Sequence, residues 1–145
     1  MNAPADPHFA LRIRASFARQ KAMALIGAAL AAVDAGVVEI RLPFRDELTQ
    51  QKGFVHGGII GMIADSACGY AAYSLMPADC SLVTVEYKIN ILAPATCALS
   101  ARGEVVKAGR TLTVTRGEVY AEDRTHIATM QQTLMRLPGR PDHPE

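Results

Sequence analysis

Apolar residues recur at three- and four-residue spacing between Gly53 and Met76, and this period predicts one long helix. The apolar face consists of Ile59, Ile60, Ile63, Ala67, Tyr70, Ala71 and Leu75. A second stripe is unusually small and consists of Gly58, Gly61, Asp65, Gly69 and Ala72. Interior glycines each cost a helix roughly 0.5–1 kcal/mol relative to alanine, so we expect packing on both sides to hold this helix. The small stripe either packs closely against another element or lets a ligand approach Asp65, the one carboxylate inside the segment.

After Pro77 the pattern changes to the two-residue period of strands, which continues to the end of the domain. Strands are predicted over residues 82–92, 97–107, 110–122 and 125–137, separated by Ala93-Pro94-Ala95, Ala108-Gly109 and Asp123-Arg124. In the first strand Val83, Val85, Tyr87, Ile89 and Ile91 alternate with Thr84, Glu86, Lys88 and Asn90. This alternation predicts that the two sets face opposite sides of a sheet.

The segment before the long helix is less regular. Residues 8–21 predict a short amphipathic helix. Residues 22–34 are Ala-rich, which favours a helix, but Asp34-Ala35-Gly36 resembles a hairpin turn into a strand over 37–44, so we expect strands on both sides of it. A polar loop follows over 46–52.

These elements predict an α+β fold in which an antiparallel sheet wraps one long central helix. We expect an N-terminal extension with a short helix over residues 1–21, a single domain over 22–137 and a solvated tail over 138–145.

Composition narrows the classes of function. The chain has 145 residues, 50% hydrophobic and 20% charged, with a formal net charge of +1, and no basic block favours nucleic-acid binding. Three cysteines without CxxC spacing (Cys68, Cys80 and Cys97) indicate a reducing compartment, and four scattered histidines predict no metal site. The longest other apolar run, residues 22–33, is too short to span a membrane, and we expect a cytoplasmic protein rather than one with a signal peptide.

The start of the long helix and Asp65 together suggest a chemistry. Helix N-termini present free N–H groups and positive charge, and Gly57 and Gly58 leave these donors uncovered, as an oxyanion from a carbonyl under attack requires. Asp65 is the candidate base or nucleophile. Together they predict hydrolysis of an activated acyl group without a metal or other cofactor.

Distance adds a condition. Gly57 and Asp65 are eight residues apart, so they lie about 12 Å apart along one helix. Both must reach the same carbonyl, and therefore we expect a two-fold homodimer in which antiparallel helices pair Gly57 of one subunit with Asp65 of the other.

Several stretches resemble the signature of hotdog-fold acyl-CoA thioesterases of the PaaI type. They are Val55-His56-Gly57-Gly58, Asp65, Gly69-Tyr70-Ala71-Ala72, Val85 to Asn90 with Pro94-Ala95, and Lys107 to Thr111. The resemblance covers residues 22–137 and implies a hotdog fold, acyl-CoA as substrate, and a dimer that joins two sheets edge to edge and is often doubled to a tetramer.

The resemblance also implies roles for individual residues. The Gly57 N–H forms the oxyanion hole, and Asp65 acts across the dimer interface by activating water or attacking the thioester itself. Gln50 helps to place the thioester or water, and Thr84 assists near Asp65; related enzymes often carry Asn and Ser at these two positions.

Other candidates have two interpretations each. His56 either braces the loop before the helix or contacts substrate, and Lys107 and Arg110 either bind a CoA phosphate or lie on a solvated turn. We expect Cys68 to be a small core residue and not a nucleophile. Candidate pocket residues are Gly58, Phe54, Met62, Tyr70 and Tyr73.

Two other functions stay open. One is a non-catalytic acyl-CoA-binding or regulatory module, which would not need Asp65. The other is a hotdog dehydratase or hydratase, which would pair a catalytic histidine with an acid near the helix.

Overall fold

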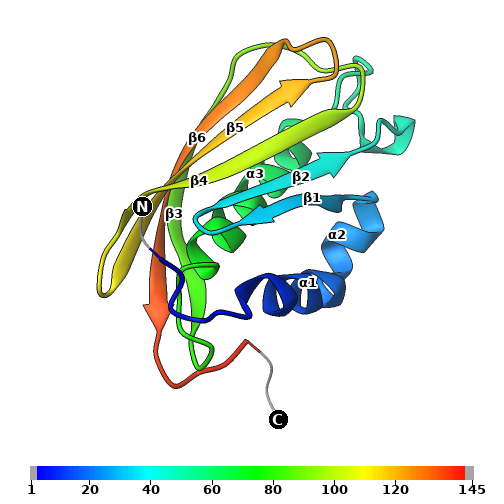
Figure 1. Ribbon diagram of the computed structural model, residues 1–145. Helices are drawn as coiled ribbons and strands as arrows, with labels where there is room; N and C mark the ends of the chain where they lie inside the picture. Colours follow the sequence, from blue (N-terminus) through cyan, green and yellow to red (C-terminus); the bar gives the residue numbers. More distant parts are fainter. Residues whose placement is uncertain (1–2, 143–145) are drawn as a thin grey trace.

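The computed structural model describes residues 3–142, in which three helices lie against a curved sheet (Figure 1). The helices are α1 (Phe9–Arg19), α2 (Lys21–Ile26) and α3 (Gly57–Tyr73), with a short 3-10 helix at Asp46–Leu48. The strands are β1 (Ala29–Asp34), β2 (Val37–Leu42), β3 (Ser81–Ile91), β4 (Leu99–Ala108), β5 (Leu112–Ala121) and β6 (His126–Leu137).

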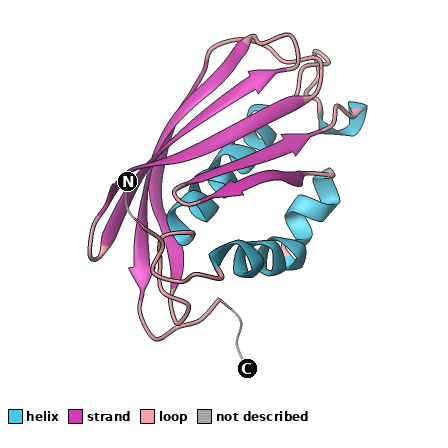
Figure 2. Cartoon of the chain, viewed as in Figure 1, coloured by secondary structure: helices cyan, strands magenta, loops and turns pink. Residues whose placement is uncertain are grey.

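The six strands form one antiparallel sheet in the order β1-β2-β4-β5-β6-β3. The helices lie on one side of this sheet, with α3 against its concave face (Figure 2). The helix lies very close to the sheet at Gly103, where an added Cβ would lie 2.3 Å from the Ala67 carbonyl carbon. This arrangement is the α+β hotdog fold that the resemblance implied.

The long helix is shorter than its sequence pattern. Gly53 lies in a turn with φ of 79°, and His56 is extended, so the helix begins only at Gly57. It ends at Tyr73, ahead of Pro77. Most of its length is buried, as we expected from its apolar face and its interior glycines.

The prediction of strand for the whole of residues 22–34 was wrong in its first half. Lys21–Ile26 is helical, and Met23 and Ile26, three residues apart, are both buried. Gly27, with φ of 78°, ends this helix in the left-handed conformation, and β1 begins at Ala29. The alanines favour helix here, whereas the predicted turn before β2 is correct and centres on Gly36, with φ of 79°.

The predicted strict alternation along the first long strand was also wrong. In β3 the pairing with β6 shifts between Thr84 and Glu86, so that Thr84 lies opposite Leu134 and Tyr87 lies opposite Gln132. Leu134 and Gln132 are both fully buried and share one face of β6. A β-bulge therefore brings Thr84 and Tyr87 to the same side of the sheet, facing α3.

Strand β3 forms one edge of the sheet and exposes apolar side chains. Val85 is 54% exposed, Tyr87 is 46% exposed and Ile91 is 47% exposed. An apolar, unpaired strand edge is a surface that favours pairing with another strand.

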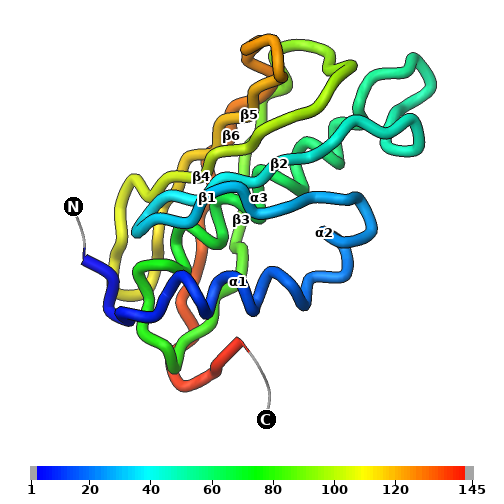
Figure 3. The backbone as a smooth tube through the Cα atoms, turned by 45° about the vertical axis from the view of Figure 1, so that its right-hand side comes forward, coloured from blue at the N-terminus to red at the C-terminus, as the bar shows by residue number. Residues whose placement is uncertain are grey.

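The chain after β6 turns back toward α1 (Figure 3). Residues 138–142 are exposed, as expected for a tail, but Asp142 bonds to Ser16 and Arg19. The rest of the predicted tail, 143–145, and the first two residues of the predicted N-terminal extension lie outside the described residues. No described helix is long and apolar enough to cross a membrane.

Candidate active site

The Asp65 carboxylate is held by two side chains from the sheet. Thr84 Oγ1 donates a hydrogen bond of 2.9 Å to Asp65 Oδ1, and Gln132 Nε2 donates one of 2.5 Å to the same oxygen. Gln132 Nε2 also donates to Thr84 Oγ1 at 2.8 Å, which closes a triangle. No side chain or backbone group among residues 3–142 bonds Asp65 Oδ2. The triangle therefore fixes one carboxylate oxygen and leaves the other for chemistry.

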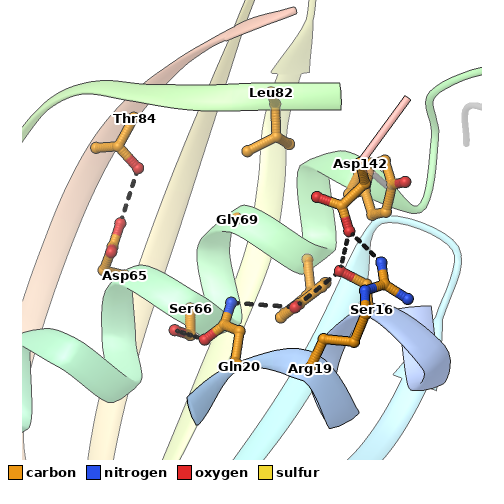
Figure 4. Close-up of a pocket in the computed structure, with 11 residues that line it drawn as sticks. Ser16, Arg19, Gln20, Asp65, Ser66, Gly69, Leu82, Thr84 and Asp142 are labelled. Atoms are coloured by element: carbon orange, nitrogen blue, oxygen red, sulfur yellow. Dashed lines mark hydrogen bonds and ion pairs between the residues drawn. The ribbon is translucent and has the colours of Figure 1, made fainter. Parts of the chain in front are cut away.

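Asp65 and Thr84 line a cavity of about 330 Å³ between α1, α3 and the start of β3 (Figure 4). The small stripe of α3 faces this side, because Gly69 also lines the cavity. An added Cβ at Gly69 would meet Leu134 at 3.9 Å, an ordinary contact. At Asp65 and Gly69, the stripe of small residues on α3 therefore borders a cavity and does not pack closely against another backbone.

His56 acts as the cap of α3. Its Nδ1 accepts a 2.8 Å hydrogen bond from the Gly58 N–H, so the ring proton lies on Nε2. This contact is the bracing role that we considered for His56. It also occupies the Gly58 N–H, whereas the Gly57 N–H has no acceptor within the described residues.

Gly57 lines a second cavity of about 330 Å³ at the start of α3. Gln50 and Phe54 line it too, together with the chain after β3. Gln50 Oε1 accepts from the Lys52 N–H, which leaves its amide NH₂ as the free donor of that side chain. Within residues 3–142, this cavity therefore has two donors without an acceptor, the Gly57 backbone N–H and the Gln50 amide.

The two cavities share no lining residue. Asp65 and Thr84 line one of them and Gly57 and Gln50 the other, so a single chain presents two half-sites. This separation agrees with the distance along the helix worked out from the sequence. Lys107 is exposed on the hairpin between β4 and β5 and lines neither half-site.

Of the remaining candidate residues, some line the Asp65 cavity and the others line neither cavity. Arg110 is exposed on the same hairpin as Lys107 and likewise lines neither half-site, so a role in CoA binding stays a prediction for both. Tyr70 and Tyr73 line the Asp65 cavity, and Met62 lines neither cavity.

Two groups of residues were missed. Gln132 belongs to a polar pair, Gln131-Gln132, that breaks the period of its strand, and this irregularity is the only signal in the sequence. Ser16, from the amphipathic α1, and Gln20, between α1 and α2, also line the Asp65 cavity, and polar residues are expected at such positions in any case.

Cys68 lies one turn from Asp65 but is inert. It is fully buried, and burial raises the pKa of its thiol to about 12. A thiol that stays protonated is a poor nucleophile. No group of three His, Cys, Asp or Glu side chains with metal-binding geometry occurs among the described residues.

Comparisons with known proteins identify the family of this chain. The model of a family described as the thioesterase superfamily matches residues 52–128, which include both half-sites' main residues, Gly57 and Asp65. A thioesterase family protein from Silicibacter pomeroyi is 49% identical in sequence, and its crystal structure superposes with a TM-score of 0.87 over 90% of this chain and 99% of that one.

A more distant solved structure shows the same fold, and a curated relative matches in sequence. The Escherichia coli PaaI protein from the phenylacetic acid degradation operon is 19% identical, with a TM-score of 0.85 over 91% of this chain and 95% of that one. A candidate esterase of Halobacterium salinarum is 30% identical over 97 residues, and the match spans 63% of this chain and 64% of that protein. On these matches and the hotdog architecture, the chain belongs to the thioesterase superfamily.

Proposed function

We propose that the protein hydrolyses acyl-CoA thioesters to the free acid and CoA. The observation that carries this proposal is the Asp65 carboxylate, which lines a cavity and has one oxygen fixed by Thr84 and Gln132, while its other oxygen has no partner in the described part of the chain. The unpaired Gly57 N–H at the start of α3 supplies the second group that such a reaction needs. Membership of the thioesterase superfamily supports the reaction class.

The complete site is formed by two subunits. Strand β3 is an exposed apolar edge, and antiparallel pairing of two copies of β3 would continue the sheet and bring the two α3 helices side by side. The Gly57 half-site of one subunit would then face the Asp65 half-site of its partner, and the dimer would have two equivalent sites. We include a dimer of dimers in the proposal, as the resemblance implies.

The reaction needs one proton acceptor and one oxyanion donor. Asp65 Oδ2 takes a proton from water as the water oxygen bonds to the thioester carbon, and the Gly57 N–H of the other subunit stabilises the oxyanion. The carbon–sulfur bond then breaks, and the CoA thiolate takes up a proton. If Asp65 attacks the carbon directly, Oδ2 forms an anhydride that water cleaves to give the same products.

The other site residues support these two groups. Thr84 and Gln132 orient Asp65, Gln50 donates its amide to the thioester or the water, and His56 holds the start of α3 through Gly58. Phe54 lines the cavity beside Gly57 and contributes to substrate binding. We assign the protein to the cytoplasm because Cys68, Cys80 and Cys97 are all free thiols.

The test is Asp65→Asn, assayed by thiol release from a panel of short, long and aromatic acyl-CoAs. We expect the variant to keep its fold and its oligomeric state and to lose most turnover. Wild-type turnover in the variant would contradict the proposal. Binding of acyl-CoA by the wild type without thiol release would indicate a non-catalytic module, and hydration or dehydration of the acyl chain would indicate a hydratase.

The route is tested by a single turnover in H₂¹⁸O. Label in the Asp65 side chain would identify an anhydride that water cleaves at the aspartyl carbon, whereas label found only in the released acid is expected both for direct attack by water and for an anhydride cleaved at the acyl carbon.

A further inference from the structure

The wall of the Asp65 cavity opposite β3 is polar. It is built by Ser16 and Arg19 from α1 and by Gln20, which follows α1 (Figure 4). Tyr70 of α3 also lines this wall. Ser16 and Tyr70 are each 6% exposed, so their hydroxyl groups are buried at this wall. Nothing in the proposed chemistry at Asp65 uses these groups.

Hydrogen bonds along this wall run in one direction. Gln20 Nε2 donates to the Tyr70 hydroxyl at 3.0 Å, and Tyr70 lies 3.1 Å from Ser16 Oγ. Ser16 in turn donates its own hydroxyl hydrogen to the Asp142 carboxylate, so the Tyr70 hydroxyl is the donor in its contact with Ser16. Burial raises the pKa of Tyr70, which keeps this hydroxyl protonated and able to donate. The last donor in this series is the Ser16 hydroxyl, and an anionic acceptor suits the position that it faces.

A carboxylate occupies that position. Asp142, from the segment after β6, accepts from Ser16 and also from Arg19 Nη2 at 2.9 Å. The side chains of this ion pair are 42% and 38% exposed, so the pair is screened by solvent and contributes little to stability. Asp142 is thus bound only weakly by Ser16 and Arg19, whose donor groups suit a carboxylate.

We propose that Ser16 and Arg19 form a subsite for a carboxylate at the far end of the acyl chain, so that the preferred substrates are thioesters of dicarboxylic acids. This inference rests on the proposed thioester hydrolysis at Asp65. Tyr70 lies five residues beyond Asp65, about 7.5 Å along the helix axis, which leaves room for an acyl chain between the reacting carbonyl and the subsite. Asp142 is displaced when such a substrate binds.

The experiment compares adipyl-CoA with hexanoyl-CoA, which have the same chain length and differ in the terminal carboxylate. We expect kcat/KM to be about tenfold higher for adipyl-CoA, the factor that one charge-assisted hydrogen bond of ordinary strength provides. In Arg19→Gln and in Ser16→Ala this ratio is expected to fall toward one. Arg14→Gln is the matched control on the same helix, since Arg14 is exposed and has no ion pair among the described residues, and it is expected to keep the wild-type ratio.

A further variant tests whether Asp142 competes with the substrate for this subsite. Asp142→Ser removes the competing carboxylate, and we expect it to lower KM for adipyl-CoA while the Asp65 chemistry is unchanged. A wild-type ratio near one, or an equal loss with both substrates in Arg19→Gln, would overturn the subsite and place the anion elsewhere, for example on the CoA phosphates. No thiol release with either substrate would instead refute the thioesterase proposal itself.

Discussion

Gln132 offers a direct test of how the Asp65 carboxylate is held. Methionine at this position has similar length and volume but cannot donate to Asp65 Oδ1 or Thr84 Oγ1. Thr84 would remain as the single donor to Oδ1. We therefore expect Gln132→Met to lower kcat and to leave KM nearly unchanged, because the lost contact orients the reacting group and touches no substrate.

The magnitude follows from the lost hydrogen bond. A hydrogen bond to a charged group contributes about 1.5–3 kcal/mol, and each 1.36 kcal/mol of barrier is a factor of ten, so kcat is expected to fall by about 10- to 150-fold. Gln132 is fully buried and its Oε1 has no partner within the described part of the chain, so the glutamine already carries an unsatisfied acceptor. Replacing it with an apolar side chain should change the free energy of unfolding by only about 1 kcal/mol.

The assay is thiol release under steady-state conditions, with urea unfolding measured on the same preparations. Thr84→Val and the double variant complete a mutant cycle, and the two losses in kcat should be strongly non-additive because both side chains bond the same oxygen. The reasoning is refuted if Gln132→Met keeps wild-type kcat, or if its activity loss tracks a large loss of stability.

Three further outcomes are expected. Gly103→Ala should destabilise the fold by roughly 1–3 kcal/mol in urea unfolding, because its Cβ would lie 2.3 Å from Ala67 backbone; an unchanged midpoint would mean that the helix does not approach the sheet so closely. Hydrogen bonding to the His8 N–H lowers the pKa of Asp6, so its contribution to stability is present above its usual pKa of 3.8 and is lost as pH falls through the lower folded value. Asp6→Asn should accordingly lower the melting temperature at pH 7 and have little effect near pH 2, and the reverse order would contradict this account. Iodoacetamide at pH 7.5 should leave Cys68 unmodified and activity intact, since burial raises the pKa of this thiol to about 12. Peptide mass mapping of the treated protein would show whether Cys68 is modified.

The periodic elements of the fold could be predicted from the sequence. The helical period of α3 and the two-residue periods of the strands arise from one buried face in each element, and burial leaves a direct trace in residue order. The hairpin turn at Gly36 could likewise be predicted, because its positive φ favours glycine. Residues 22–26 could not be assigned reliably, because their alanines favour a helix while the hairpin turn at Gly36 favours a strand before it, and two buried positions are too few to define a period.

The site could be predicted only where a backbone feature or a lone charge marked it. Gly57 and Asp65 stand out against an apolar helix, and their separation implied two half-sites, which the two cavities agree with. The bulge in β3 and the contact of Gln132 with Asp65 depend on strand pairing between segments nearly fifty residues apart. Register of this kind is set by tertiary packing and leaves no local pattern.

The site predicted between subunits is most directly tested by mixing two inactive variants. Asp65→Asn removes the carboxylate, and Gly57→Pro removes the backbone N–H and adds a pyrrolidine ring in its place. Proline is favoured at the first helical position, His56 before it is already extended, and the nearest atom to an added Cβ is Ile91 Cγ1 at 4.0 Å. Both variants should therefore fold and dimerise, and each alone should be nearly inactive.

In a mixed dimer, one of the two sites would combine the intact Gly57 of one subunit with the intact Asp65 of the other. After unfolding and refolding of an equimolar mixture, about half of the dimers are mixed and each has one intact site, so the account predicts recovery of about one quarter of wild-type activity. Absence of recovery, with mixed dimers demonstrated by native mass spectrometry, would contradict a site shared between subunits.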